Sequence, residues 1–236
     1  MLSWEYPHRA ATKKAAKSSV TTLRREAEAG DEEAEPVFAE RSFRRPARRS
    51  ASVRTSKLSA AETGSAHHKF LQHLALANAD DVAALKAEAA RLEREKVLSP
   101  AEVAALDLEA IGAFWASPPG EKIRAQAACV RRELAFTAKF SPPELAEITG
   151  TKPETGLESE FVVVQGVVDL AVLLPEEIWL VDFKTDDLRA DQLPAKTKIY
   201  APQLKLYARA LGKIYGRPAN ACWLHFLSLR RSVPVD

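Results

Sequence analysis

The sequence predicts an α/β (α+β) domain in which helices precede a mixed sheet and cover it. Helix capping signals and helical spacing of apolar residues dominate positions 59–120. Strand-like apolar runs follow between residues 130 and 184, and a long amphipathic helix then leads into one more strand. Helices, three strands, a helix and a strand are the element order of a mixed sheet with helices on its faces.

The first well-marked helix is predicted to begin after Ser59. Ser59 and Glu62 have the spacing of a capping box, in which a serine at the N-cap is followed by a glutamate three residues later. Phe70, Leu71 and Leu74 then continue the segment as an apolar stripe with helical spacing.

Two more helices are expected before residue 120. The segment 80–97 begins with two aspartates and is rich in Ala and Leu. The next helix is expected from Ser99 to near Trp115, with Ser99 as the cap, Pro100 at the first helical position and Glu102 completing a capping box. The three helices are expected to form a small helical part over residues 59–120, ahead of a sheet core at 121–236.

The sheet core is expected to start with a short helix over residues 121–129. Two-residue alternation then predicts a strand over 130–138, and a Pro- and Glu-rich loop is expected at 141–155. Two apolar runs, 160–174 and 178–184, are predicted to be neighbouring strands.

A strong helix is predicted over residues 195–215, with Gly216 as its C-terminal stop. The final strand is expected over 220–229, with Val233 as its continuation.

The composition is that of a globular protein with one substantial domain. The 236 residues are 46% apolar and 28% charged, and no apolar run approaches the roughly 20 residues that span a bilayer. The first ten residues lack a signal-peptide pattern, and Cys129 and Cys222 alone cannot hold a zinc or iron–sulfur site. We therefore expect a cytoplasmic protein with no membrane contact.

Residues 1–58 are expected to form an N-terminal arm or linker that is partly disordered and basic. The first 60 residues hold 13 Lys and Arg against 8 Asp and Glu, whereas the whole chain has a net charge of only +2. One helix is expected within the arm, over residues 20–29, with Ser18 or Ser19 as its cap. The basic part could contact DNA phosphates or could be a solvated linker; its candidate DNA-contacting residues are Arg44, Arg45, Arg48 and Arg49.

Charged residues inside the apolar runs point to the site. Asp169 lies in one predicted strand, and Asp182 and Lys184 lie 13 and 15 residues later in the next, where strand periodicity directs both to one side. Two carboxylates and a lysine at a sheet edge are typical of a Mg²⁺ or Mn²⁺ site for phosphodiester cleavage. The alternative is an ordinary surface hairpin with an Asp–Lys pair.

The helix that follows offers further polar side chains. Gln203 and Tyr207 lie four residues apart and therefore share a face, and Tyr200 is three residues before Gln203. Gln203 could hydrogen-bond a metal-bound water or the lysine, and Tyr207 could hydrogen-bond a phosphate oxygen. Tyr200 could line the same cleft against DNA. Alternatively, Tyr207 is a core aromatic residue.

Other candidates for the metal site are weaker. His67, His68 and His73 cluster on the first well-marked helix, where spacing places His67 on the apolar stripe and His68 at its edge. A histidine on a helix is more often structural than a ligand, so the spacing leaves ligation open. Glu133 could reach the cleft as an outer acid. No phosphate-binding loop is present in the sequence, and no ATPase activity is expected.

Three segments together resemble a known family: Q-G-V-V-D, L-V-D-F-K-T-D and Y-A-P-Q-L-K-L-Y-A-R-A-L, all within residues 165–211. They are similar to the RecB-family PD-(D/E)xK nucleases, in particular the C-terminal nuclease domain of AddA proteins in AddAB helicase–nucleases. The resemblance extends upstream through V-R-R-E-L-A-F-T and G-S-A-H-H-K-F-L-Q-H-L and covers most of the chain.

The resemblance implies a restriction-endonuclease-like αβββαβ core and metal-dependent cleavage of DNA, usually as an exonuclease that trims ends for recombination. It implies Mg²⁺ or Mn²⁺ ligands at His68, Asp169 and Asp182, with the backbone carbonyl of Phe183. Lys184 would be the catalytic lysine, and Gln203 and Tyr207 would be the Q-x-x-x-Y pair. Two departures are Phe183, where tyrosine is common, and the additional histidine at position 67.

The resemblance also implies partners. In the family, this domain works with a helicase motor and a second, AddB-like protein, and this chain lacks both the motor and the four cysteines of the partner's iron–sulfur cluster. The chain is therefore expected to be a fragment, a separately encoded nuclease or a remnant. The competing function is a catalytically idle module that binds DNA or docks to a helicase.

Overall fold

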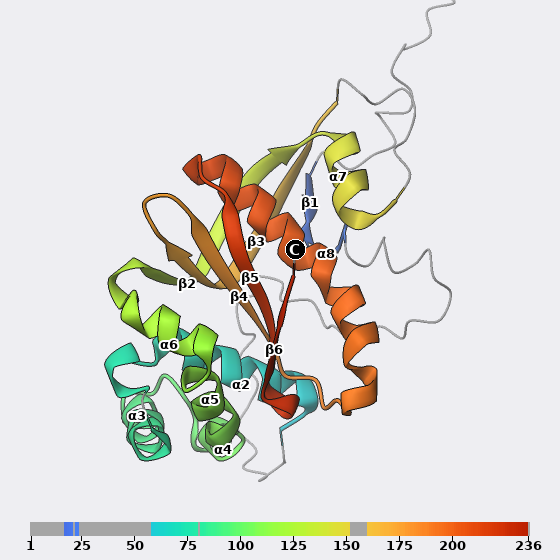
Figure 1. Ribbon diagram of the computed structural model, residues 1–236. Coiled ribbons are helices and arrows are strands. Elements are labelled where there is room, and N and C mark those ends of the chain that lie inside the picture. Colours follow the sequence, from blue (N-terminus) through green and yellow to red (C-terminus); the bar gives the residue numbers. More distant parts are fainter. Residues whose placement is uncertain (1–16, 21, 24–57, 80, 152–159, 236) are drawn as a thin grey trace, which may run out of the picture.

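A six-stranded mixed sheet lies at the centre of the computed structural model (Figure 1). The structure describes residues 17–20, 22–23, 58–79, 81–151 and 160–235. The predicted αβββαβ order is present and the mixed α/β fold is confirmed.

The longest strand, β3 (Val162–Leu173), organises the sheet. Along one edge it pairs antiparallel with β2 (Val130–Phe140). Along its other edge, the first half of β3 pairs parallel with β1 (Lys17–Ser19), and the second half pairs antiparallel with β4 (Ile178–Lys184). The charged segment of β4 therefore lies next to the middle of β3.

The chain leaves β4 for the long helix α8 (Leu193–Tyr215) and returns as β5 (Ala219–Phe226), parallel to β4. β6 (Arg231–Pro234) completes the sheet antiparallel to β5. A parallel pair needs a crossover connection, and α8 provides it.

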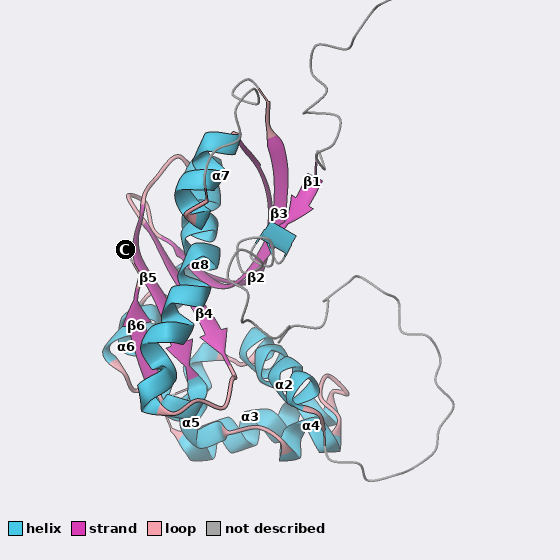
Figure 2. Cartoon of the chain, turned by 90° about the vertical axis from the view of Figure 1, so that its right-hand side faces the viewer, coloured by secondary structure: helices cyan, strands magenta, loops and turns pink. Residues whose placement is uncertain are grey.

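Two layers of helices pack on the sheet. One apolar cluster joins α8 and α7 (Pro142–Thr149) to the sheet through residues such as Leu180, Leu204 and Leu224. The other joins five helices to Leu170, Val172, Val181 and Phe183 of the strands. These helices, seen at the foot of the sheet in Figure 2, are α2 (Ala60–His73), α3 (Val82–Arg94), α4 (Pro100–Ala104), α5 (Leu108–Trp115) and α6 (Pro118–Ala125).

The alternation of side chains along β4 determines which face of the sheet its charged residues, Asp182 and Lys184, lie on. Val181 and Phe183 point into the α2–α6 cluster, whereas Leu180 packs with α8. Asp182 and Lys184 alternate with Val181 and Phe183, so they share the α8 face, as the two-residue periodicity predicts.

The capping signals were read correctly from the sequence. Ser59 and Ser99 both form the predicted capping boxes, with Glu62 and Glu102. β4 has the predicted bounds, and Gly216 follows α8 with a φ of 67°, a conformation that glycine adopts without strain.

Three predictions about helices were wrong. The segment from Ser99 to Trp115 is two helices rather than one, because Asp107 accepts the N–H of Ala110 and starts α5 anew. α6 begins at Pro118 instead of residue 121, with Ser117 as its N-cap. The predicted loop 141–155 contains α7, which a third capping box begins. A serine followed by two prolines was read as a break in both places, although proline fits the first turn of a helix.

The two ends of the sheet also differ from the prediction. The last strand ends at Phe226, and the chain reverses through the turn 227–229, so Val233 belongs to a separate strand that pairs with Leu224. β1 was not predicted. Ser19 accepts the N–H of Thr22 as the predicted cap. Of the helix expected over 20–29, residues 21 and 24–29 lie outside the described residues.

The division of the chain at residues 58 and 120 stays a prediction. The α2–α6 helices share one apolar cluster with the strands, and most of residues 1–58 lie outside the described part. Within the described residues, none of the helices has the length and apolar character that crossing a membrane requires.

Candidate active site

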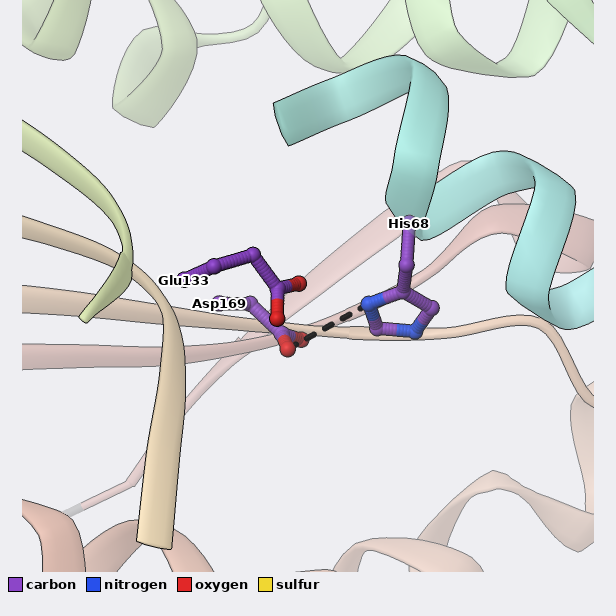
Figure 3. Close-up of side chains that lie close together, drawn as sticks. All are labelled: His68, Glu133 and Asp169. Carbon is purple, nitrogen blue, oxygen red and sulfur yellow. Dashed lines mark ion pairs between the residues drawn. The ribbon is translucent and has the colours of Figure 1, made fainter. Parts of the chain in front are cut away.

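The carboxylate of Asp169 joins α2, β3 and β4. Its Oδ1 lies 3.2 Å from Nδ1 of His68 on α2, and its Oδ2 accepts the backbone N–H of Phe183 at 2.8 Å. Figure 3 shows the imidazole of His68 directed from α2 toward Asp169. Two residues that lie about a hundred positions apart in the sequence are thus in contact.

Glu133 of β2 completes a cluster that could hold a metal ion. The pairs Arg132 with Leu170 and Leu134 with Val168 place Glu133 directly across from Asp169. Among the described residues, His68, Glu133 and Asp169 each offer a ligand atom within 4.8 Å of the other two (Figure 3). Glu133 has a φ of 48°, a conformation that is uncommon for a residue with a side chain and is typical of functional sites.

Lys184 lies at the other side of the site, on β4. Its ammonium is 2.6 Å from Oδ2 of Asp182, and both side chains are buried. It also donates a hydrogen bond to Oε1 of Gln203 at 3.2 Å, and Nε2 of Gln203 donates to the hydroxyl of Tyr207 at 2.7 Å. The predicted Q-x-x-x-Y pair of α8 is therefore brought to the lysine.

The two aspartates have pKa values shifted in opposite directions. Burial alone would raise the pKa of Asp169, but the charges of His68 and Lys184 and the hydrogen bond from Phe183 outweigh it, so the pKa lies below its usual value. For Asp182, burial and the nearby charge of Asp169 raise the pKa against the opposing effect of Lys184. A divalent cation would favour the ionised form of both carboxylates.

The donor atoms of the site fit a hard divalent cation. Carboxylate oxygens suit Mg²⁺, and one imidazole beside them suits Mn²⁺. Oδ2 of Asp182 is buried and, among the described residues, receives no hydrogen bond of acceptable geometry despite the close ammonium of Lys184. The Phe183 carbonyl stays a predicted ligand; the N–H of the same residue donates to Asp169.

The neighbouring histidine, His67, has a different environment. Its Nε2 accepts the backbone N–H of Asp107 at 2.9 Å, so its Nδ1 carries the proton and donates to the carbonyl of Thr63 at 2.8 Å. Burial holds the pKa of His67 below its usual value. Both ring nitrogens are engaged, so of the clustered histidines it is His68 that meets the carboxylates, and the exposed His73 lies at the end of α2.

Three contacts fix α2, the helix that carries His68. A Cβ added at Gly64 would lie 2.7 Å from Oγ1 of Thr185, so α2 approaches the end of β4 closely only because residue 64 is glycine. The guanidinium of Arg132 donates to the carbonyls of Leu71 and Leu74 at the helix C-terminus. The contact of His67 with the start of α5 is the third.

Tyr200 lies beneath Lys184 rather than at the surface. Only 1% of its surface is exposed, its hydroxyl donates to the carboxylate of Asp186, and the Lys184 ammonium is 4.3 Å from the ring centroid. This buried position does not support the predicted DNA contact of Tyr200. The predicted DNA-contacting residues of the arm lie outside the described residues; they are Arg44, Arg45, Arg48 and Arg49.

Sequence reasoning missed three residues at the site. Asp186 follows D-F-K-T directly, and an acid so close to the cluster was a usable signal. Arg132 precedes Glu133 in a strand, and Gly64 precedes His68 by one helical turn. The contacts of Arg132 and Gly64 depend on how α2 crosses the sheet, and that of Asp186 with Tyr200 depends on the packing of α8; no local pattern reveals either.

The comparisons with known proteins agree with this geometry. The sequence profile described as the PD-(D/E)XK nuclease superfamily matches residues 37–232. Several curated AddA proteins, which are subunits of ATP-dependent helicase/nucleases, are similar over nearly the whole chain. The protein of Moorella thermoacetica is 34% identical over 231 residues, which is 96% of this chain and 16% of its own length.

Two further relatives of the same name show the same pattern. The protein of Desulforudis audaxviator is 35% identical over 238 residues, covering 99% of this chain and 18% of its own. That of Bacillus cytotoxicus is 30% identical over 243 residues, covering 100% of this chain and 19% of its own. The chain thus spans less than a fifth of the length of these relatives.

Proposed function

Because this chain belongs to the PD-(D/E)XK nuclease superfamily, as its motifs predicted, we propose that it is a metal-dependent deoxyribonuclease. The observation that carries the proposal is the meeting of Asp169, Asp182 and Lys184 with His68 at one place on the sheet. Burying two carboxylates and a lysine is costly, and a domain with a purely structural role has no need of such a cluster.

We propose that Mg²⁺ or Mn²⁺ is held by His68, Asp169, Asp182 and the Phe183 carbonyl, with Glu133 as a further carboxylate. When bound, the cation would supply Lewis-acid activation of the scissile phosphate and of water. The ligands come from α2, β2, β3 and β4, so a correctly folded sheet and helix are required before the ion can be held.

The remaining residues act on the reacting groups in this proposal. Lys184 orients the attacking water and offsets the charge that develops on the phosphate oxygens. Gln203 accepts a hydrogen bond from the Lys184 ammonium at its Oε1 and donates one from its Nε2 to the hydroxyl of Tyr207. Tyr207 accepts this bond and is buried against Phe136, so in this proposal it holds Gln203 in place rather than contacting a phosphate oxygen.

We also propose that the enzyme is an exonuclease on single-stranded DNA ends within a helicase–nuclease that serves double-strand break repair and recombination. The name that the relatives carry, ATP-dependent helicase/nuclease, supports the helicase–nuclease part of this proposal. A helicase motor and an AddB-like protein would be the partners, in the cytoplasm and near the nucleoid. The basic arm would contact the DNA.

Cleavage of labelled DNA tests the activity. The purified chain should digest fluorescent single-stranded DNA when Mg²⁺ or Mn²⁺ is present, and Asp182→Asn or Lys184→Ala should lower the rate at least a hundredfold. The matched controls are the exposed residues of the same type, Asp191→Asn and Lys205→Ala, which should cleave like the wild type. Cleavage by the Lys184→Ala protein at the wild-type rate would overturn the proposal.

The second candidate function is an idle module that binds DNA or docks to a helicase. The excess of Lys and Arg in the first 60 residues favours it. Calorimetric titration with Mn²⁺, run beside the digestion, separates the two functions. Metal binding and DNA binding without any cleavage product would favour the idle module, whereas metal-dependent product formation excludes it.

A further inference from the structure

The ammonium of Lys184 is enclosed by three groups that differ in kind. Asp182 provides a carboxylate at 2.6 Å and Gln203 an amide oxygen at 3.2 Å. The third is the ring of Tyr200, whose centroid is 4.3 Å away. A cation this close to an aromatic face is attracted by the ring, and the attraction is larger where water is excluded. Lys184 and Tyr200 are 6% and 1% exposed.

The ring of Tyr200 is held in its plane from its far end. Its hydroxyl donates to the carboxylate of Asp186, with oxygen distances of 2.9 and 3.0 Å. On the sheet side, Phe226 packs against the ring at 6.2 Å between centroids. An anchored ring offers the ammonium one fixed surface.

Asp186 is fixed in turn by the turn that follows β5. The hydroxyl of Ser228 donates to the backbone carbonyl of Asp186 at 2.7 Å and accepts the N–H of Leu188 at 3.3 Å. The Lys196 ammonium, 4.0 Å from the Asp186 carboxylate and 6.0 Å from the ring, is another cation nearby. The position of Asp186 is therefore set by both its own loop and the turn at 227–229.

We propose that Tyr200, anchored by Asp186, is a positioning residue that directs the Lys184 ammonium toward Asp182 and Gln203. Its consequence for catalysis rests on the nuclease function proposed above. Three supports hold the end of a lysine that four rotatable bonds would otherwise leave mobile.

Tyr200 could instead be an ordinary core residue that only fills space. Two substitutions at this position separate such a packing role from the positioning of Lys184. Tyr200→Phe keeps the ring and loses the anchor to Asp186. Tyr200→Leu loses the ring and keeps an apolar side chain at the site. Tyr215→Leu is the matched control, since Tyr215 lies on the same helix and packs on the same apolar cluster away from Lys184.

A spectroscopic test is independent of cleavage. In the ¹H–¹³C spectrum of ¹³C-lysine-labelled protein, the ε-methylene protons of Lys184 should lie upfield of the other lysines because of the ring current of Tyr200. The Lys184 signal is assigned by its disappearance in Lys184→Arg. The shift should persist in Tyr200→Phe and Tyr215→Leu and vanish in Tyr200→Leu. An unshifted Lys184 signal in the wild type would overturn the inference without the need for any Tyr200 variant.

The kinetic test uses the same variants under single-stranded DNA cleavage. Tyr200→Leu should lower kcat about tenfold with KM unchanged. Tyr200→Phe keeps the aromatic ring, so its kcat should stay within about threefold of the wild-type value. A Tyr200→Leu protein that folds, binds Mn²⁺ and keeps the wild-type kcat refutes the inference while the nuclease function stands. A wild type that shows the shifted lysine but cleaves no DNA refutes the nuclease function instead.

Discussion

The imidazole of His67 accepts the backbone N–H of Asp107 across forty residues of sequence, at 2.9 Å. This bond ties the middle of α2 to the first turn of α5. The next residue, His68, points instead to Asp169, with 3.2 Å between Nδ1 and Oδ1. Two adjacent histidines therefore have different tasks: one holds the helix in place, and the other is presented to the carboxylates.

Substitution of His67 should mainly lower stability, whereas substitution of His68 should mainly weaken metal binding. His67→Ala removes a buried imidazole together with its hydrogen bonds to Asp107 and Thr63 and should lower the free energy of unfolding by about 2 kcal/mol. His68→Ala removes the imidazole from the carboxylate cluster and should weaken Mn²⁺ binding at least tenfold. Urea unfolding and calorimetry with Mn²⁺ measure the two effects. Equal losses of metal affinity in both variants would contradict the assignment.

Gly64 should be required for the placement of His68. Alanine usually stabilises a helix interior by about 1 kcal/mol relative to glycine. At position 64, however, the new Cβ would meet Oγ1 of Thr185 at 2.7 Å, so α2 or Thr185 must shift. Gly64→Ala should therefore weaken Mn²⁺ binding, measured by calorimetry, despite its higher helix propensity.

The matched rescue for Gly64→Ala is the removal of the opposing hydroxyl. The double variant with Thr185→Ala should bind Mn²⁺ like Thr185→Ala alone, because the obstructing Oγ1 is gone and Cβ of Thr185 is 3.8 Å away. Additive losses of affinity in the double-mutant cycle would show that Gly64 does not act through Thr185.

Glu133 should contribute to metal binding. Its carboxylate lies in one cluster with His68 and Asp169, so Glu133→Gln, which keeps the shape and removes the charge, should lower Mn²⁺ affinity about tenfold. The exposed Glu121→Gln is the control and should bind Mn²⁺ like the wild type. Calorimetry provides the measurement, and an unchanged affinity in Glu133→Gln would remove this residue from the site.

Glu88 should make the α2–α6 helices sensitive to acid. Its buried carboxylate accepts hydrogen bonds from Arg91, Ala75 and Asn78, and chiefly the bond from Arg91 lowers its pKa to about 2. A carboxylate with a lowered pKa stabilises the fold above its usual value of 4.5, and this contribution is lost as the pH falls from 4.5 toward 2.

Replacing Glu88 by glutamine should remove that dependence. Glu88→Gln should lower the free energy of unfolding by about 2 kcal/mol at pH 7, because Arg91 loses the buried one of its two carboxylate partners, Glu88 and Glu95. The difference from the wild type should shrink steadily as the pH falls from 4.5 toward 2 in urea unfolding experiments. A difference that stays constant over this range would mean that folding does not lower the pKa of Glu88.

Local patterns in the sequence were sufficient for much of the fold. The capping boxes at Ser59 and Ser99 and the apolar run of β4 all gave correct element positions, because they depend on neighbours within a few residues. The same logic extends to Asp182 and Lys184, whose shared face follows from the two-residue period of a strand. The superfamily could be named for the same reason, since its motifs are short and local.

Only the tertiary structure decided which distant residues meet. Spacing left His67 and His68 as alternatives, and the crossing of α2 over the sheet assigned one to Asp107 and the other to Asp169. The pairing of β2 with β3 brought Glu133 to the cluster, and the packing of α8 placed Tyr200 beneath Lys184. These contacts join segments that are far apart in the chain, and strand pairing and the packing of the helices against the sheet, rather than any local preference, determine them.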